Sequence, residues 1–312
     1  MNDCLPIISG LFENIRKVII GKDEQIKQLL CCWLAGGHIL IEDAPGTGKT
    51  ILARAVSKSA KVAFRRIQFT PDLLPTDIVG SAIYNQQKGS FEFMRGPVFT
   101  TILLADEINR ATPRTQSALL EAMAEGQVTA EGMTWPLPQL FFVIATQNPI
   151  EQHGTFPLPE AQLDRFMMKI SMGYPKIEEE IGMLKGQNDA HPIHSLQPVE
   201  SEERVKYARD SVPKVKIADP VYQYAVKLVA STRKSKDLKL GASPRATAAL
   251  MRAAQAAALM EGQAYVQPSH VYHLARIVLA HRLVPTAEAR LAGKSAEAIL
   301  DGLLKELPVP VQ

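Results

Sequence analysis

Residues 42–50, EDAPGTGKT, place two glycines directly before a lysine and a threonine. Gly46 and Gly48 allow a backbone whose N–H groups point inward, because no Cβ blocks the approach of a phosphate oxygen. Lys49 supplies a cation for the β- and γ-phosphates of a nucleotide, and Thr50 supplies a hydroxyl ligand for Mg²⁺. The stretch therefore predicts a phosphate-binding loop of the G-x-x-x-x-G-K-[ST] type.

Asp43 stands where that pattern has its first glycine. We expect this change to be tolerated, because the position shapes only the exit from a strand. Aspartate can adopt the left-handed conformation and hydrogen-bond to its own backbone. The context fits, since 38–42 reads as a strand and 51–60 as a helix whose positive dipole end faces the phosphates. The residues expected to bind the nucleotide here are Asp43, Ala44, Pro45, Gly46, Thr47, Gly48, Lys49, Thr50 and Ile51.

Polar residues also stand at the C-terminal ends of two further apolar runs. In ILLADE (102–107), Asp106 is expected to hold the Mg²⁺ shell and Glu107 to polarise a water aimed at the γ-phosphate. Asn148 ends the run LFFVIATQN, at the strand end where parallel sheets place their ligands. We expect its amide to orient the attacking water or to contact the γ-phosphate.

Two arginines are candidates for contacts that complete such a site. Arg165 follows a short helical segment and has two readings: a surface ion pair with Asp164 or Glu160, or an arginine finger donated to the ATP of a neighbouring subunit. Arg245, in GASPRA, begins a helix after a proline and could reach a phosphate as that helix moves.

The elements around these residues predict an α/β fold. Apolar strand-like runs alternate with helical segments in the first half, which indicates a parallel sheet flanked by helices. We assign residues 1–173 to an α/β nucleotide-binding domain and 174–312 to a smaller all-helical lid domain with a frayed C-terminal tail. No convincing strand is expected after the last strand of the sheet. The expected strands are 38–42, 63–69, 100–107, 140–148 and 166–172, and the helix 113–126 is expected to end at Gly126.

Two segments, 78–99 and 127–137, read as β-hairpins that a minimal nucleotide-binding sheet does not need. The second is expected to turn at Glu131 and Gly132. From the residues alone, both hairpins are as compatible with loops that have no function as with a surface that contacts a substrate or partner.

The composition limits the class of partner. The net charge of +3 is too small to indicate binding to nucleic acid or an anionic membrane. No apolar run reaches the ~18 residues of a membrane span, and the first residues lack the pattern of a secretory signal. We expect a cytoplasmic protein whose three cysteines form no disulfide framework. A solvated loop, not a nucleic-acid site, is the expected role of Arg233, Lys234, Lys236 and Lys239.

Long stretches of the chain resemble the MoxR family of AAA+ ATPases. The resemblance is carried by 68–80, 102–129, 145–166, the motif GASPRA (241–246) and VLAHR (278–282), and it covers nearly the whole chain. Members of this family often have aspartate at the first glycine of the loop, so Asp43 fits the family.

The resemblance implies a role for each candidate. Asn148 matches sensor 1, Arg165 the arginine finger and Arg245 sensor 2. Backbone contacts to adenine are implied near Ile19 and Gly21. The Walker A residues it implies are Gly46, Gly48, Lys49 and Thr50, and the Walker B residues are Asp106 and Glu107.

The resemblance also implies contacts outside the nucleotide. The two hairpins match the helix-2 insert and the pre-sensor-1 hairpin of this clade, and Gln68 could couple client binding to Glu107. The cofactors implied are ATP and Mg²⁺, and the assembly implied is a homo-oligomeric ring, usually a hexamer. The function implied is chaperone-like remodelling or maturation of a client protein with a von Willebrand A-domain partner. That partner must act in trans, because this chain has no D-x-S-x-S motif.

Two other functions remain open at this level. One is a nucleotide-controlled binding scaffold with negligible turnover, which would not need both Glu107 and Arg165. The other is a DNA-associated AAA+ motor, which the near-neutral charge and the acidic residues Glu92 and Glu131 near the hairpins disfavour.

Overall fold

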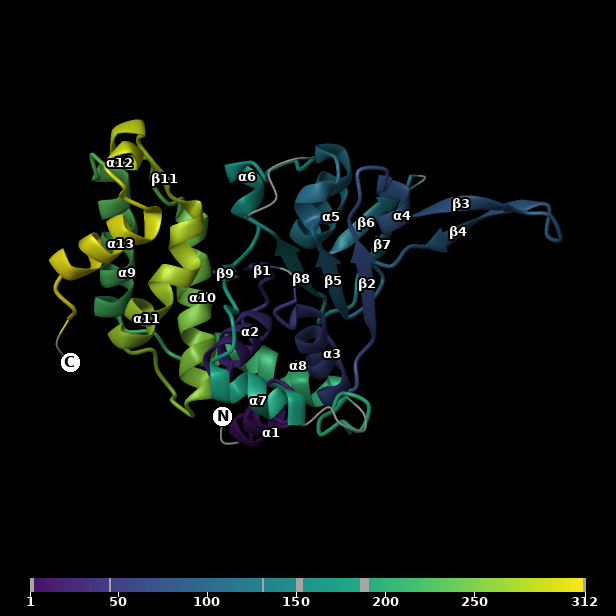
Figure 1. Ribbon diagram of the computed structural model, residues 1–312, viewed down its shortest axis with the longest axis horizontal. Helices are drawn as coiled ribbons and strands as arrows, with labels where there is room; N and C mark the ends of the chain where they lie inside the picture. Colours follow the sequence, from purple (N-terminus) through teal and green to yellow (C-terminus); the bar gives the residue numbers. More distant parts are fainter. Residues whose placement is uncertain (1–2, 45, 131, 150–153, 186–190, 311–312) are drawn as a thin grey trace.

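The computed structural model describes residues 3–44, 46–130, 132–149, 154–185 and 191–310. Its centre is a five-stranded parallel sheet in the order β2-β5-β8-β1-β9 (Figure 1). All five strands lie within the segments predicted from the sequence, each shorter at one or both ends. Their bounds are β1 Ile39–Glu42, β2 Phe64–Gln68, β5 Ile102–Asp106, β8 Phe142–Gln147 and β9 Met168–Ile170.

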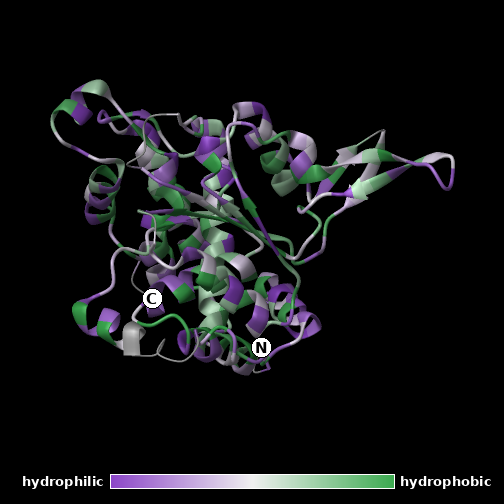
Figure 2. Ribbon diagram, turned by 45° about the vertical axis from the view of Figure 1, so that its right-hand side comes forward, coloured by the Kyte–Doolittle hydropathy of each residue, from purple (hydrophilic) through white to green (hydrophobic). Residues whose placement is uncertain are grey.

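The central strands are apolar up to their polar carboxyl ends, because helices cover both faces of the sheet. On one face, alternate side chains such as Ile39 and Ile41 join a core with α1 (Cys4–Arg16), α2 (Asp23–Leu34) and α3 (Lys49–Ser59). On the other face, their neighbours such as Leu40 join a core with α5 (Pro113–Glu125). The apolar segments of the ribbon gather accordingly in and beside the sheet (Figure 2).

Helix α5 (Pro113–Glu125) ends as predicted at Gly126, which adopts φ +63° and donates its N–H to Ala122 O. Glycine tolerates this left-handed conformation without a steric penalty. The chain then turns directly into the second hairpin.

Both predicted hairpins are present. The first follows α4 (Pro75–Val79) and pairs β3 (Gly80–Asn85) with β4 (Ser90–Arg95), projecting far from the body of the molecule (Figure 1). The second pairs β6 (Gln127–Ala130) with β7 (Met133–Pro136).

The two hairpins contact each other through aromatic rings. The ring of Phe93 stacks on Trp135 with centroids 5.3 Å apart and an interplanar angle of 11°. The guanidinium of Arg95 lies over Trp135 at 5.5 Å and over Phe99 at 5.3 Å. This packing joins two insertions that are separate in the sequence.

The remainder of the chain is mainly helical, and α10 packs against α11 within it, on the side of the lid that faces the sheet (Figure 1). Among the described residues, no helix is both long and apolar enough to cross a membrane. After β9 come the helices α7 Ile177–Lys185, α8 Glu202–Ser211, α9 Asp219–Lys234, α10 Pro244–Met260, α11 Pro268–Leu279, α12 Ala287–Leu291 and α13 Ala296–Glu306, with the 3-10 turns η2 Val212–Lys214 and η3 Ala280–Arg282. The 3-10 turn η1 (Ile108–Arg110) and helix α6 (Glu160–Leu163) lie before β9.

One expectation about this part is wrong. Strands β10 (Leu238–Leu240) and β11 (Val284–Pro285) form a small antiparallel pair in the lid, where no strand was expected. Both are too short for their apolar alternation to mark them in the sequence.

The domain boundary after residue 173 stays a prediction. Helix α8 lies beyond it, yet packs against α1 in the same core. Three predicted features concern residues outside the described ones: the loop residue Pro45, the turn residue Glu131 and the end of the frayed tail, 311–312.

Candidate active site

The two glycines of the loop between β1 and α3 adopt a backbone conformation that suits phosphate binding. Gly46 and Gly48 both have φ +85°, and open space lies where a Cβ would stand on either residue. Helix α3 begins at Lys49, so its unpaired N–H groups open toward the loop. These features suit an anion.

The ammonium group of Lys49 lies inside this loop. Its Nζ donates to the carbonyl oxygens of Asp43, at 3.0 Å, and Ala44, at 3.2 Å, and Thr47 Oγ1 also donates to Ala44 O at 3.4 Å. Burial lowers the pKa of Lys49, and the nearby carboxylates oppose that shift. An amine with its charge only partly compensated suits a phosphate partner.

The backbone conformation and the hydrogen-bond partners of Asp43 differ from those expected. Among the non-glycine residues described, only Lys61 and Glu107 have positive φ, so Asp43 is not left-handed. Its buried carboxylate accepts hydrogen bonds from Ser171 Oγ at 3.0 Å, from Gly173 N at 3.2 Å and from Met172 N. The left-handed conformation considered for Asp43 is therefore absent, and its carboxylate ties the loop to the segment that leaves β9.

Asp106 is the last residue of β5 and Glu107 follows it, and one hydroxyl contacts both residues. Thr146 Oγ1 donates to Asp106 Oδ1 at 2.6 Å and accepts from the backbone N–H of Glu107 at 2.8 Å. Glu107 has φ +56°, an uncommon conformation for this residue type. Thr146 was not among the residues predicted from the sequence, although its position on β8 beside β5 follows from the strand order.

Three polar side chains hold the two carboxylates. Arg66 Nη2 donates to Asp106 Oδ2 at 2.7 Å and to Gln68 Oε1 at 2.6 Å. Gln68 Nε2 donates in turn to Glu107 Oε2 at 2.6 Å, and Arg110 Nε lies 3.0 Å from the same oxygen. Gln68 and Glu107 are therefore in direct contact, while the coupling of client binding to Glu107 through Gln68 stays a prediction. Arg66 was missed, and its only signal is a charge on the edge strand β2, two residues before Gln68, which lies opposite Asp106.

The loop and the carboxylates meet in one cavity of about 410 Å³. Asn148, which is buried, lies in its wall together with Lys49 and Glu107. Larger cavities of about 660 and 720 Å³ lie between helices and lack both a glycine-rich loop and the acidic pair. The lining residues of the first cavity are Gly46, Thr47, Gly48, Lys49, Thr50, Ile51, Arg66, Gln68, Asp106, Glu107, Thr146, Gln147 and Asn148.

The described wall of this cavity does not include either candidate arginine. Arg165 directs Nη1 to Leu120 O on α5, at 2.9 Å. Arg245 is exposed in the first turn of α10. If either residue acts on a nucleotide, it does so through another subunit or a movement of the lid.

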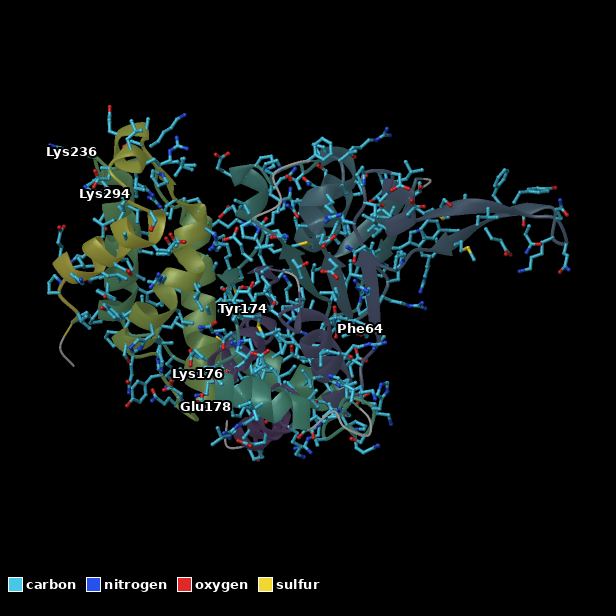
Figure 3. All side chains as sticks on the ribbon, viewed as in Figure 1. Phe64, Tyr174, Lys176, Glu178, Lys236 and Lys294 are labelled. Carbon is cyan, nitrogen blue, oxygen red and sulfur yellow. The ribbon has the colours of Figure 1, made fainter. Side chains whose placement is uncertain are left out.

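The candidate adenine contacts lie near the start of α7. Ile19 is buried, and Gly21 has φ +73° with the carboxyl group of Glu179 packed against it. Lys22 Nζ donates to Tyr174 O at 2.9 Å. Figure 3 labels Tyr174, which is 77% exposed on the segment that leads from β9 to α7.

The basic cluster predicted to be a solvated loop lies at the outer end of the lid, where Figure 3 labels Lys236 and Lys294. Lys294 Nζ donates to Asp237 Oδ2 at 2.7 Å, and Arg233 Nε donates to Ala242 O at 2.7 Å. These contacts are local to the lid.

The donor set of the cavity fits Mg²⁺. Thr50 and Asp106 offer a hydroxyl and a carboxylate, and no group of three or more metal-ligating side chains occurs among the described residues. Mg²⁺ in nucleotide sites is held by one or two protein oxygens, with phosphates and water as the other ligands. Thr50 and Asp106 match that pattern.

Comparisons with known proteins agree with this geometry. Residues 38–168 match a family described as "ATPase family associated with various cellular activities (AAA)", and residues 230–303 match an AAA lid domain. The chain is 47% identical to the uncharacterized protein YeaC of Bacillus subtilis, over 99% of this chain and 97% of that protein. It is 39% identical to the chaperone MoxR1 of Mycobacterium tuberculosis, over 96% and 81%. A crystal structure of a candidate ATPase from Cytophaga hutchinsonii superposes with a TM-score of 0.91 at 38% identity, over 99% of this chain and 98% of that one.

Proposed function

The chain belongs to the MoxR family of AAA+ ATPases, and from that premise we propose that it forms a ring in the cytoplasm that couples Mg²⁺-dependent ATP hydrolysis to the remodelling of a client protein. The observation that carries the proposal is the meeting of the phosphate loop, the acidic pair and Asn148 in one cavity.

Each side chain in the cavity has a distinct task. Lys49 and the N–H groups of the loop bind the β- and γ-phosphates, and Thr50 and Asp106 would hold the metal. Bound Mg²⁺ neutralises charge on the phosphates. Glu107 accepts a proton from the attacking water, which Asn148 orients.

Gln68 gives this site a means of control. Its hydrogen bond to Glu107, together with Arg110, occupies the carboxylate that must accept the proton. Gln68 lies on β2, the strand that leads through α4 into the projecting hairpin. We propose that client contact at the hairpin shifts Gln68 and frees Glu107.

Arg165 completes the site of a neighbouring subunit. An arginine finger stabilises the charge that develops on the transferred phosphoryl group and contributes about 10³–10⁵ in rate. Its place outside its own cavity supports action across an interface. A hexamer is the assembly that the family suggests.

The projecting hairpin fits a protein client better than DNA. Phe91 is 73% exposed and Met94 64% exposed, while Lys88 is paired with Glu92 at 2.6 Å. Exposed apolar side chains mark protein contacts. We propose a client or adaptor with a von Willebrand A domain, acting in trans.

A first experiment separates binding from turnover. Glu107→Gln should bind ATP and retain it, because the base is lost while the phosphate contacts remain. Arg165→Ala should bind ATP normally and hydrolyse it about 10³-fold more slowly. Wild-type hydrolysis by either variant in single-turnover kinetics would refute the assigned roles.

The two alternatives have their own readouts. A scaffold would show near-zero multiple-turnover hydrolysis even at high protein concentration. A DNA motor would bind DNA tightly, with a steep dependence on salt, in a gel shift at physiological ionic strength.

A further inference from the structure

The turn that carries Arg165 is held by the lid of its own chain. This turn joins α6 to β9, and Figure 1 shows α6 at the side of the sheet that faces the lid. Arg282, in the lid turn η3, donates from Nε to Asp164 Oδ1 at 2.8 Å and from Nη2 to Phe166 O at 2.8 Å. The imidazole of His281 lies with Nε2 3.0 Å from the same carbonyl oxygen.

These contacts fix the residues on both sides of Arg165. Arg282 Nη2 also donates to Asp164 O, at 3.3 Å. Arg282 therefore contacts both the carboxylate and the backbone carbonyl of Asp164. The carbonyl of Phe166 is bound by both Arg282 and His281. The backbone around Arg165 is thus held by η3 as well as by its own single-turn helix, where the N–H of Arg165 donates to Gln162 O at 3.2 Å.

Burial makes the contacts specific. The side chain of Arg282 is 4% exposed, so water cannot replace its partners, and a buried guanidinium without its carboxylate is costly. Burial, followed by the charge of Arg282, lowers the pKa of His281 to about 3. His281 is therefore neutral at physiological pH, and Nε2–H donates to Phe166 O.

We propose that Arg282 and His281 are positioning residues for the arginine finger: they hold the turn that carries Arg165 against the lid. The lid of one subunit thereby fixes the position of the arginine that contacts the ATP of the next subunit. The inference rests on the proposed action of Arg165 in trans.

The other end of the same segment is held by the phosphate loop. Beyond the turn, Lys169 on β9 pairs with Glu42 at 2.8 Å, and Asp43 binds the backbone of 172–173. In the lid, Arg245 lies close enough to Arg282 to lower its pKa, in addition to the larger effect of burial. The finger turn is thus held between the phosphate loop and the lid of its own subunit.

Mixed rings test this proposal directly. One subunit carries Arg165→Ala and keeps an intact cavity, so it is the acceptor. The other carries Glu107→Gln and keeps its finger, so it is the donor. Neither hydrolyses ATP alone, and mixing them should restore hydrolysis in acceptor sites that face a donor finger.

Arg282→Gln is then added to one subunit at a time. In the donor it should lower the restored rate about 10- to 100-fold, because a displaced catalytic group loses rate on that scale. In the acceptor, whose own finger is already absent, the restored rate should stay within about twofold. A merely structural role for Arg282 would lower the rate equally in both placements, and that result, or no loss in either, would overturn the proposal.

The design separates this inference from the proposed function. If donor and acceptor without Arg282→Gln fail to restore hydrolysis, the trans finger itself is wrong and the inference is rejected with it. The matched control is Arg276→Gln in the donor, because Arg276 is exposed on the neighbouring helix with a loose contact of 3.8 Å to Asp301. It should leave the restored rate unchanged.

A milder variant covers the case in which Arg282→Gln does not assemble. Asp164→Asn in the donor keeps a polar group in contact with Arg282 and removes only the charge. It should give the same asymmetry between donor and acceptor with a smaller loss, of about three- to tenfold. Equal losses in both placements would again reject the proposal.

Discussion

Glu107 sits in a backbone conformation that few glutamates adopt, and its carboxylate is already bonded within the protein. Strain of this kind persists only where surrounding contacts impose it, and it occurs often at catalytic groups. Here the contact is the Thr146 hydroxyl on the backbone N–H. The proposed catalytic base is thus held at its backbone by Thr146 and at its carboxylate by Gln68 and Arg110.

Removing the restraint should raise the basal rate. In Gln68→Ala, Glu107 loses the 2.6 Å hydrogen bond from Nε2 and is freer to accept a proton. We expect client-free ATP turnover to rise by up to about tenfold, which corresponds to one hydrogen bond of about 1.4 kcal/mol. Steady-state hydrolysis at saturating ATP measures it. A fall in turnover would show that Gln68 instead aligns Glu107 for catalysis.

Asp43 should contribute to stability through its contacts with the segment after β9. In Asp43→Asn the acceptor for Met172 and Gly173 loses its charge, and the free energy of unfolding should fall by about 1–3 kcal/mol. Urea unfolding measures the change. The control, Asp301→Asn, removes an exposed carboxylate and should change stability by less than about 0.5 kcal/mol. Equal effects of the two would contradict the assigned role.

At the scale of elements, the two hairpins are expected to act as one unit. Phe93 on β4 stacks on Trp135 of β7, and such pairs are worth about 0.5–1.5 kcal/mol beyond their buried area. A double-mutant cycle of Phe93→Ala and Trp135→Ala in urea unfolding should return that coupling energy. Phe91→Ala serves as control, since Phe91 packs on Tyr84 and should show no coupling to Trp135. Additive effects of Phe93 and Trp135 would mean that the hairpins are independent.

The side chain of His38, directly before β1, contacts strand β8 and helix α5. Its Nδ1 accepts from Val143 N at 3.0 Å, and Nε2 lies 3.2 Å from Met123 O. Burial lowers the pKa of His38 to about 4, so the unfolded chain binds the proton more readily. The stability that depends on neutral His38 is present above pH 6.5 and is lost as the pH falls toward 4.

The expected loss is about 1.4 kcal/mol per pH unit for this one proton. Urea unfolding at pH 7, 6 and 5 measures it, and His38→Asn should reduce the slope by one proton. An unchanged slope in the variant would contradict the assignment.

At the scale of the whole molecule, the sequence predicted the sheet and the cavity because both depend on local patterns. Apolar runs ending in Asp106 and Asn148 sit at the same edge of a parallel sheet, so their meeting follows from strand order. The partners of Asp43 and Arg282 lie more than a hundred residues away in the sequence, and nothing local indicates them. Strands β10 and β11 were missed because two or three residues carry no period.

The account as a whole depends on active sites shared between subunits. The most direct test is the specific ATPase activity as a function of protein concentration, with the mass from light scattering at each point, with and without ATP. We predict that specific activity rises steeply as the mass climbs toward a ring, because only then does Arg165 reach a neighbouring cavity. A monomer that hydrolyses ATP at full specific activity would contradict the account.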